Sequence, residues 1–271
     1  MAASYRTERD TAIVAAQRAA QMIRARAGTL DAEDVREKST NDLVTAIDEA
    51  AQSLIETELT DAFPSYDILS EEDERAGPAN PVADGHRWII DPLDGTTNFT
   101  FDAPPYAVSI ALQQGRDLVV GVVLDVPAGT LYTAIRGNGA YRNGAPMRVS
   151  STDRLDRSLI ATGFPFRTPK NIDRYMDVLG TFIGTARGVR RHGAAAIDLA
   201  QLAAGAYTGF FETGLNPWDV AAGILLIEEA GGRVTDFKSD PDALFASQMV
   251  ASNGHIHDAI LEVVHPIRDM R

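Results

Sequence analysis

The stretch WIIDPLDGTTNF, residues 88–99, runs from an apolar strand directly into two carboxylates. Pro92 restricts the backbone between Asp91 and Asp94, and Gly95 permits a tight turn after them. We therefore predict that the two carboxylates converge where the strand ends.

The residues after these carboxylates carry a second signal. If Gly95, Thr96 and Thr97 begin a helix or a turn, their backbone N–H groups can face an anion, as helix N-termini do for phosphate. The other interpretation is an acidic turn in which a Thr or Asn side chain caps a helix. On the first interpretation, one loop holds cation ligands beside a phosphate cradle.

Two further acidic segments strengthen the prediction of a cation site. SEEDE at residues 70–74 follows the apolar run 67–69, so carboxylates again come at a strand end, although such a charge run is also typical of a solvated surface. NPWDVAAG at residues 216–223 places Pro217 at a first helical position and Asp219 in the first turn. There Asp219 can bind a cation or balance the helix dipole.

Composition limits the partners and the metal chemistry. The 271 residues are 45% apolar and 23% charged, which is typical of a folded globular protein. They carry 25 basic and 38 acidic side chains, a net charge of −13 that disfavours nonspecific nucleic-acid binding. There is no cysteine, so disulfides, thiolate metal sites and thiol nucleophiles are excluded. Oxygen-rich clusters of this kind indicate a hard cation such as Mg²⁺, which would let so acidic a protein bind a phosphate.

The remaining short signals argue against other kinds of site. His255 and His257 alternate as metal ligands can, but their position after Asn253-Gly254 indicates a helix cap instead. The first apolar run, 12–16, is too short for the core of a signal peptide, and no uninterrupted apolar segment of about 18 residues occurs. We therefore expect a cytoplasmic protein.

Hydrophobic periodicity changes character near residue 150. Before it, helical spacing indicates helices around 13–23 and 44–59, the second preceded by Asn41 and Asp42 as candidate caps. After it, strands and helices alternate, as in an α/β layer. The predicted strands are 67–69, 87–90, 106–112, 118–124, 131–135, 140–149, 158–161, 188–191, 209–211, 233–237 and 249–252, and the later helices are 171–185, 195–203, 218–230 and 257–264.

The predicted organisation is a mixed α/β (α+β) fold of two subdomains. Residues 1–150 form an N-terminal α+β metal-binding subdomain with an antiparallel sheet, in which Asn143-Gly144 is the strongest hairpin signal. Residues 151–271 form a C-terminal α/β subdomain that completes the active site.

Taken together, these motifs resemble the inositol monophosphatase family, in the superfamily that includes fructose-1,6-bisphosphatase and other lithium-sensitive phosphatases. The resemblance rests on DPLDGTTN at 91–98, SEE at 70–72 and WDVAAG at 218–223, with further matching stretches over about residues 10–265. It implies a layered αβαβα sandwich, Mg²⁺ as the cofactor, inhibition by lithium and a homodimer.

The resemblance also implies which residues hold the metal. Glu71, Asp91 and the main-chain carbonyl of Leu93 match the ligands of a first Mg²⁺. Asp91, Asp94 and Asp219 match those of a second. A third, weaker Mg²⁺ in the family uses the Glu71 carboxylate and water, so Glu71 is also a candidate catalytic residue.

Further positions match the catalytic and substrate residues of the family. Thr96, linked to the Asp48 carboxylate, matches the pair that positions the attacking water. The implied substrate contacts are Asp94, Gly95, Thr96, Gly193, Ala195, Glu212 and Asp219.

The implied activity is hydrolysis of myo-inositol monophosphate to inositol and phosphate by direct attack of a metal-activated water. Related members act on 3′-phosphoadenosine 5′-phosphate, fructose-1,6-bisphosphate, histidinol phosphate or NADP, and the metal site does not choose among them. A regulatory protein that binds the transcription machinery is the alternative of another class. The expected partners are a small phosphate monoester and a second copy of the chain, with no membrane and no direct nucleic-acid contact.

Overall fold

The computed structural model describes residues 4–30, 35–39, 42–72, 85–165 and 172–270. The α-helices in these ranges are α1 (Arg6–Arg26), α2 (Ala46–Ala62), α3 (Thr96–Thr100), α4 (Ile172–Thr185), α5 (Ala195–Ala203), α6 (Pro217–Glu229) and α7 (His257–Val264). The strands are β1 (Val35–Ser39), β2 (Asp42–Thr45), β3 (Asp67–Ser70), β4 (His86–Asp94), β5 (Ala107–Gln114), β6 (Asp117–Asp125), β7 (Thr130–Ile135), β8 (Ala140–Arg142), β9 (Ala145–Met147), β10 (Leu159–Thr162), β11 (Gly188–Arg190), β12 (Gly209–Thr213), β13 (Arg233–Thr235) and β14 (Gln248–Ser252). None of the helices within the described ranges is long and apolar enough to cross a membrane.

The strands form two large sheets and a two-stranded ribbon of β1 and β2. The larger sheet has the order β3-β4-β5-β6-β7-β8-β9, and the smaller one has the order β11-β10-β12-β14-β13. In the smaller sheet β10 is parallel to β11 and β12, whereas β14 is antiparallel to β12 and β13. The α/β layer that the alternating pattern predicts is confirmed, and its sheet contains both parallel and antiparallel pairs.

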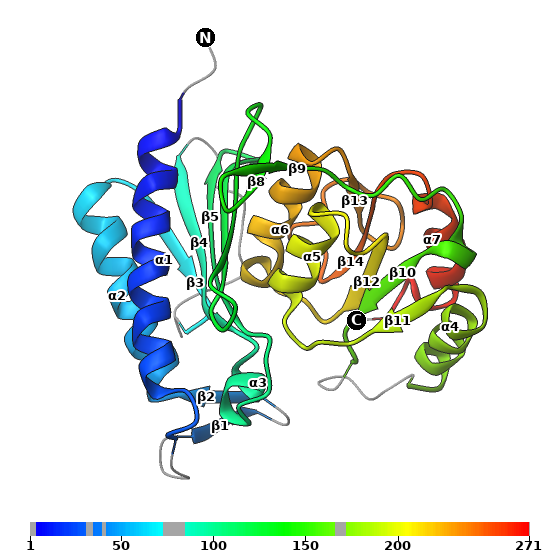
Figure 1. Cartoon of the computed structure of the whole chain (residues 1–271), viewed down its shortest axis with the longest axis horizontal. Helices are drawn as coiled ribbons and strands as arrows, with labels where there is room; N and C mark the ends of the chain where they lie inside the picture. Colours follow the sequence, from blue (N-terminus) through cyan, green and yellow to red (C-terminus); the bar gives the residue numbers. More distant parts are fainter. Residues whose placement is uncertain (1–3, 31–34, 40–41, 73–84, 166–171, 271) are drawn as a thin grey trace.

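The elements stack in five layers, alternately helical and sheet (Figure 1). Helices α1 and α2 cover the outer face of the larger sheet, α5 and α6 lie between the two sheets, and α4 and α7 cover the far face of the smaller sheet. This is the αβαβα sandwich expected from the resemblance. Because α5 and α6 come from the second half but pack on the sheet of the first half, both halves share one core, and the subdomain boundary near residue 150 stays a prediction.

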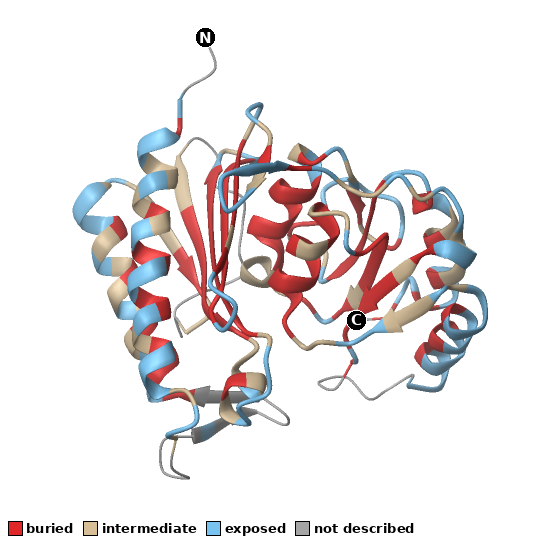
Figure 2. Cartoon of the chain, in the orientation of Figure 1, coloured by how far each residue is buried: buried red, intermediate tan, exposed pale blue. Residues whose placement is uncertain are grey.

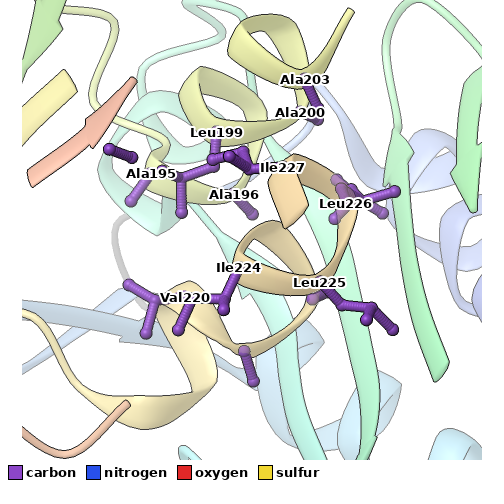
Figure 3. Packing of buried hydrophobic residues seen from close by; sticks show 14 of the residues in the cluster. Ala195, Ala196, Leu199, Ala200, Ala203, Val220, Ile224, Leu225, Leu226 and Ile227 are labelled. Carbon is purple, nitrogen blue, oxygen red and sulfur yellow. The ribbon is translucent and has the colours of Figure 1, made fainter. Parts of the chain in front are cut away.

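Most of α5 and residues 220–227 of α6 are buried, which explains the largely apolar sequences of these middle helices (Figures 2 and 3). Two glycines allow the close approach of α6 to its neighbours. A Cβ atom at Gly121 of β6 would lie 2.9 Å from the Ala222 carbonyl oxygen, and one at Gly223 would lie 2.5 Å from Leu199 of α5. Helix α6 is thus held tightly in place, and with it the residues at its N-terminus.

Two local predictions differ from the structure. Asp42 lies in β2 rather than at a helix start, Asn41 is outside the described residues, and Thr45 caps α2 instead. The Thr45 hydroxyl accepts a hydrogen bond from the Ile47 N–H, while Asp48 accepts one from the Thr45 N–H, so the pair forms a capping box. The cap therefore follows the apolar run 43–44 instead of preceding it.

The second difference concerns strand direction. The larger sheet is antiparallel from β4 onward, including the hairpin at Asn143-Gly144, where both residues have positive φ. Strands β3 and β4, however, are parallel, with Ser70 opposite Ile90. Their carboxyl ends therefore meet at one edge of the sheet, and the acidic segments that follow them lie side by side.

Neither of the paired histidines caps a helix. Ile256 occupies the N-cap position of α7, and the Asn253 side chain accepts a hydrogen bond from the His255 N–H. His257 is completely buried, with Nδ1 2.9 Å from the Ser252 hydroxyl and Nε2 3.0 Å from the Thr235 hydroxyl. It is a core residue with two polar partners.

Burial, aided by the charge of Arg233, lowers the pKa of His257 to about 4. In the unfolded chain His257 binds a proton near pH 6.5, whereas in the folded protein it does so only near pH 4. The unfolding free energy therefore decreases as the pH falls from 6.5 to about 4. Between pH 7 and pH 4, we expect the unfolding free energy of His257→Gln to decrease by about 2–3 kcal/mol less than that of wild type.

Urea denaturation of both proteins at a series of pH values measures this difference. The exposed His255, two residues earlier, supplies the matched control His255→Gln. Parallel stability curves for wild type and His257→Gln would contradict the prediction.

Candidate active site

The candidate site begins where β3 and β4 end together. The Glu71 N–H donates to the Ile90 carbonyl oxygen at 3.2 Å, which continues the parallel pairing by one residue beyond β3. Glu71 thereby follows β3 directly alongside the segment that leads to Asp91. The parallel pairing, which the sequence did not predict, is what brings these two carboxylates together.

An irregularity in β4 brings Asp94 to the same side as Asp91. In the pairing with β5, Asp91 lies opposite Ser109 and Asp94 opposite Ala107, so β4 carries one extra residue between them. Residues three apart on a regular strand point to opposite faces, and one extra residue reverses that relation. The Leu93 N–H donates to Asp91 Oδ1 at 3.0 Å and stabilises the bend.

Asp94 is held by the second half of the chain. Its carboxylate accepts hydrogen bonds from the N–H groups of Ala195 at 3.2 Å and Ala196 at 2.8 Å, at the start of α5. Burial raises the pKa of Asp94 to about 7, against the lowering effect of the Ala196 N–H. Ala195, a predicted substrate contact, therefore meets the predicted metal ligand Asp94 directly.

Asp219 lies in the first turn of α6, as predicted from Pro217. Its Oδ2 accepts a hydrogen bond from the Asn216 N–H at 2.6 Å, which completes a capping box. The predicted place of Asp219 in the first turn is thus confirmed, and its role in the capping box is an addition to that prediction. The role of Asp219 as a metal ligand stays a prediction, and the cap holds the carboxylate in a fixed place for it.

The acidic residues interact strongly with one another. Asp91 is buried, and burial, followed by the negative charges of Glu71, Asp94 and Asp219, raises its pKa well above the ordinary range. Carboxylates and a backbone carbonyl are the ligands that Mg²⁺ prefers, so the donor types fit this cation. Within the described residues, however, no three Asp, Glu or His side chains form a group that could hold a metal as placed, so binding requires the carboxylates to draw closer together.

Asp48 and Thr96 form the hydrogen-bonded pair that the resemblance predicts. The Thr96 hydroxyl lies 2.8 Å from Asp48 Oδ1 and 3.1 Å from the Leu93 carbonyl oxygen. The Asp48 carboxylate also accepts hydrogen bonds from the N–H and the hydroxyl of Thr45, and it is completely buried. Burial raises the pKa of Asp48 while these hydrogen bonds oppose the rise.

The turn at Gly95 packs against the turn at Gly193. Gly95 has φ +87°, and a Cβ atom there would lie 3.3 Å from both the Gly193 carbonyl oxygen and the Ala194 Cβ. Asn98 fastens the two turns together, since its Nδ2 donates to the His192 carbonyl oxygen and to the Pro105 carbonyl oxygen at 2.7 Å each. Gly193 thus faces the loop that begins α3.

Glu212, the last predicted substrate contact, lies at the end of β12. It is partly buried, and burial, followed by the charges of Asp198, Asp219 and Asp94, raises its pKa well above the ordinary range. Its charge interactions place it beside two of the predicted metal ligands. Direct contacts therefore join Asp48 to Thr96, Asp94 to Ala195 and Gly95 to Gly193, whereas Glu212 and Asp219 are linked to the other carboxylates through their charges.

Sequence reasoning missed several supporting residues. Asn98 is part of the quoted motif but had no assigned role, although it joins the two loops. His192 lies 3.0 Å from the buried Asp198 and 3.1 Å from the Tyr207 hydroxyl, and these contacts stabilise the turn before α5. No local pattern links positions so far apart in the sequence, so the spacing of residues could not assign this role to Asn98.

Comparison with known proteins agrees with this geometry. A sequence model described as the inositol monophosphatase family matches residues 5–269. The Nus factor SuhB of Pseudomonas aeruginosa is 42% identical over 259 residues, which is 95% of each chain. Among solved structures, the extragenic suppressor protein suhB of Bartonella henselae has a TM-score of 0.86 at 38% identity, covering 94% of this chain and 97% of its own. The inositol monophosphatase of Anabaena sp. PCC 7120 has a TM-score of 0.83 at 36% identity, covering 96% of this chain and 95% of its own. The chain therefore belongs to the inositol monophosphatase family.

Proposed function

We propose that the protein is a Mg²⁺-dependent phosphomonoesterase that hydrolyses myo-inositol monophosphate to inositol and phosphate. The observation that carries the proposal is the convergence of buried Asp91 and Asp94 beside the Asp48–Thr96 hydrogen bond. The first pair suits a divalent cation, and the second suits the orientation of a water molecule. Hydrolysis of a phosphate monoester is very slow without a catalyst, and a bound cation and an oriented water molecule together accelerate it.

In this proposal the acidic residues acquire their catalytic role with a cation. Glu71, Asp91, Asp94, Asp219 and the Leu93 carbonyl would hold Mg²⁺. When bound, Mg²⁺ supplies positive charge that stabilises the phosphoryl oxygens and promotes ionisation of water. The raised pKa of Asp91 is consistent with this role, because a carboxylate repelled by its neighbours gains most from a nearby cation.

The protein's own groups orient the reactants. The Thr96 hydroxyl can accept a hydrogen bond from water while it donates to Asp48, and Asp48 is fixed by Thr45. The water oxygen then attacks phosphorus in line with the ester oxygen, whose bond to phosphorus breaks as that oxygen takes up a proton. In this proposal the backbone N–H groups of Gly95 and Thr96, at the start of α3, face the phosphoryl oxygens.

The leaving group lies toward the second half in this proposal. Gly193 lies against Gly95 and the Ala195 N–H donates to Asp94, so both are near the proposed cation site. Glu212 can accept hydrogen bonds from ring hydroxyl groups. The name of the Anabaena relative, an inositol monophosphatase, supports a polyol substrate. The adenosine, fructose, histidinol and NADP phosphates are the alternative substrates.

Hydrolysis of these five esters, with Mg²⁺ and with a chelator, tests the proposal. We expect the highest kcat/KM for myo-inositol 1-phosphate and loss of activity with the chelator. A clear preference for the adenosine nucleotide would overturn the substrate, and no Mg²⁺-dependent hydrolysis of any ester would overturn the phosphatase. Inhibition by lithium is a further proposal that the same assay covers.

A second candidate function is binding to the transcription machinery. It is favoured by the name of the Pseudomonas aeruginosa relative, a Nus factor. Asp94→Asn separates the two functions in cells, because it should abolish a phosphatase role and leave a binding role intact. Survival of the cellular function in this variant would favour the second candidate.

We also propose a homodimer. Ile172, Met176 and Ile183 of α4 are 40%, 52% and 65% exposed, and their spacing places them on one side of the helix. Such an apolar stripe supports contact with a second copy. Sedimentation at micromolar concentration tests this, and a monomer there would count against it.

A further inference from the structure

The Glu212 carboxyl group lies directly against the backbone of a glycine in the neighbouring strand. A Cβ atom built at Gly163 would be 1.8 Å from Glu212 Oε1 and 2.4 Å from Oε2, and the first of these is the shortest such distance among the described glycines. Gly163 follows β10, which is parallel to β12 with Thr162 opposite Phe211. The carboxyl group therefore occupies the space that any other residue at position 163 would fill.

Buried hydrogen bonds hold the Gly163 peptide in place. The Tyr175 hydroxyl donates to the Gly163 carbonyl oxygen at 2.5 Å, and Thr162 Oγ1 donates to the Phe211 carbonyl oxygen at 2.7 Å. The two hydroxyl oxygens are 2.9 Å apart, and both side chains are completely buried. This network ties the end of β10 to α4 and to β12, so the glycine keeps its position beside Glu212.

The absence of a side chain at Gly163 leaves the space that the carboxyl group of Glu212 occupies. No residue in the described part of the chain donates a hydrogen bond to it. The negative charges of Asp198, Asp219 and Asp94 raise the pKa of Glu212, and the positive charge of Arg191 lowers it. A partly buried carboxyl group to which none of the described residues donates a hydrogen bond is available to accept hydrogen bonds from a ligand. Its usefulness then depends on its exact place.

We propose that Gly163 is a specificity-determining position, and Tyr175 a positioning residue, because together they place the Glu212 carboxyl group where it accepts hydrogen bonds from hydroxyl groups of the leaving group. This inference rests on the proposed phosphatase function. It deepens that function by selecting polyol phosphates over esters whose leaving group lacks neighbouring hydroxyl groups.

Gly163→Ala is the main test because it moves Glu212 at small cost to the fold. The atoms that the alanine Cβ would meet belong to the end of the flexible Glu212 side chain. The φ angle of Gly163 is outside the left-handed region, so an alanine can adopt the same backbone conformation. We expect KM for myo-inositol 1-phosphate to rise about tenfold or more, because the substrate loses at least one hydrogen bond to Glu212. For p-nitrophenyl phosphate, which lacks hydroxyl groups beside the ester, kcat and KM should stay within about twofold. The thermal midpoint should change little.

A double-mutant cycle shows whether the effect passes through Glu212. In a Glu212→Ala background, Gly163→Ala and Tyr175→Phe should each add almost nothing to KM, whereas in the wild-type background each raises it. Additive effects would overturn the proposal, since they would mean that the substitutions damage the site in another way. So would equal losses on both substrates.

The matched control is Gly180→Ala, in the same half of the chain. A Cβ atom at Gly180 of α4 meets nothing within 4 Å, so neither substrate should be affected. Crystal structures of wild type and Gly163→Ala supply a readout that does not depend on activity, and Glu212 should leave the surface of residue 163 in the variant. An unmoved carboxyl group overturns the inference, while inactivity of the wild type on both esters overturns only the proposed function.

Discussion

Asp91→Asn is expected to lower kcat/KM for myo-inositol 1-phosphate by at least about a thousandfold. Asp91 is the one carboxylate assigned to both the first and the second Mg²⁺. The asparagine amide has neither the negative charge nor the second anionic oxygen of the aspartate. The amide oxygen can still accept the hydrogen bond from the Leu93 N–H, so the bend in β4 should persist. Steady-state assays across a range of Mg²⁺ concentrations measure the loss.

The same substitution should raise the stability of the metal-free protein. The pKa of Asp91 is raised by burial and by Glu71, Asp94 and Asp219, so the folded state holds this carboxyl at a free-energy cost at pH 7. Stability from such a group is present at low pH and is lost as the pH rises through its raised pKa. A neutral amide removes the cost, and we expect the unfolding free energy in chelator to rise by about 1 kcal/mol or more.

These opposite signs separate a metal ligand from a structural aspartate. Loss of both activity and metal-free stability in Asp91→Asn would show that Asp91 serves the fold. Asp125→Asn is the matched control, because Asp125 is also buried, with a raised pKa and one hydrogen bond from a backbone N–H, but lies outside the proposed ligands. Its activity should stay near that of wild type.

Thr96→Val is expected to lower kcat about a hundredfold or more, with KM for the ester little changed. Valine keeps the shape of threonine but has no hydroxyl to link a water molecule to Asp48, 2.8 Å away. The substitution leaves unchanged the backbone N–H groups proposed to bind phosphate and the carboxylates proposed to bind the cation, which is why the effect should fall on kcat. Steady-state kinetics at saturating Mg²⁺ provides the measurement.

Thr96→Ser tests whether the hydroxyl is responsible. Serine restores the hydrogen bond to Asp48, so it should recover most of the lost rate. If Thr96→Val keeps the wild-type kcat, or if Thr96→Ser is as impaired as Thr96→Val, the water-positioning role is wrong. Thermal denaturation of both variants checks that the buried Asp48 has not destabilised the fold.

The sites of these two predictions depend on both halves of the chain. Asp91, Thr96 and Asp48 come from the first half, but the α5 N–H groups that hold Asp94 come from the second. Asn98 joins the halves by its hydrogen bond to the His192 carbonyl. The tight packing of α6 on β6 at Gly121 makes this junction rigid, because backbone meets backbone there.

Local sequence determined most of the elements and the chemical character of the site. Hydrophobic periodicity predicted the long strands and α4 to α7, and the Asn143-Gly144 dipeptide predicted the hairpin, since both signals depend on neighbouring residues. The absence of cysteine and the acidic segments at strand ends indicated an oxygen-ligand cation site. The start of α2 was misjudged because Asn41 and Asp42 resemble caps as well as Thr45 does.

Only the tertiary structure decided how these residues meet. The parallel pairing of β3 with β4 sets Glu71 beside Asp91, the extra residue in β4 turns Asp94 to the same side, and Gly163 makes room for Glu212. Each depends on strand register or on contacts between distant segments, which the spacing of side chains along one segment does not specify. The sequence thus determined which groups the protein possesses, and long-range packing decided which of them act together.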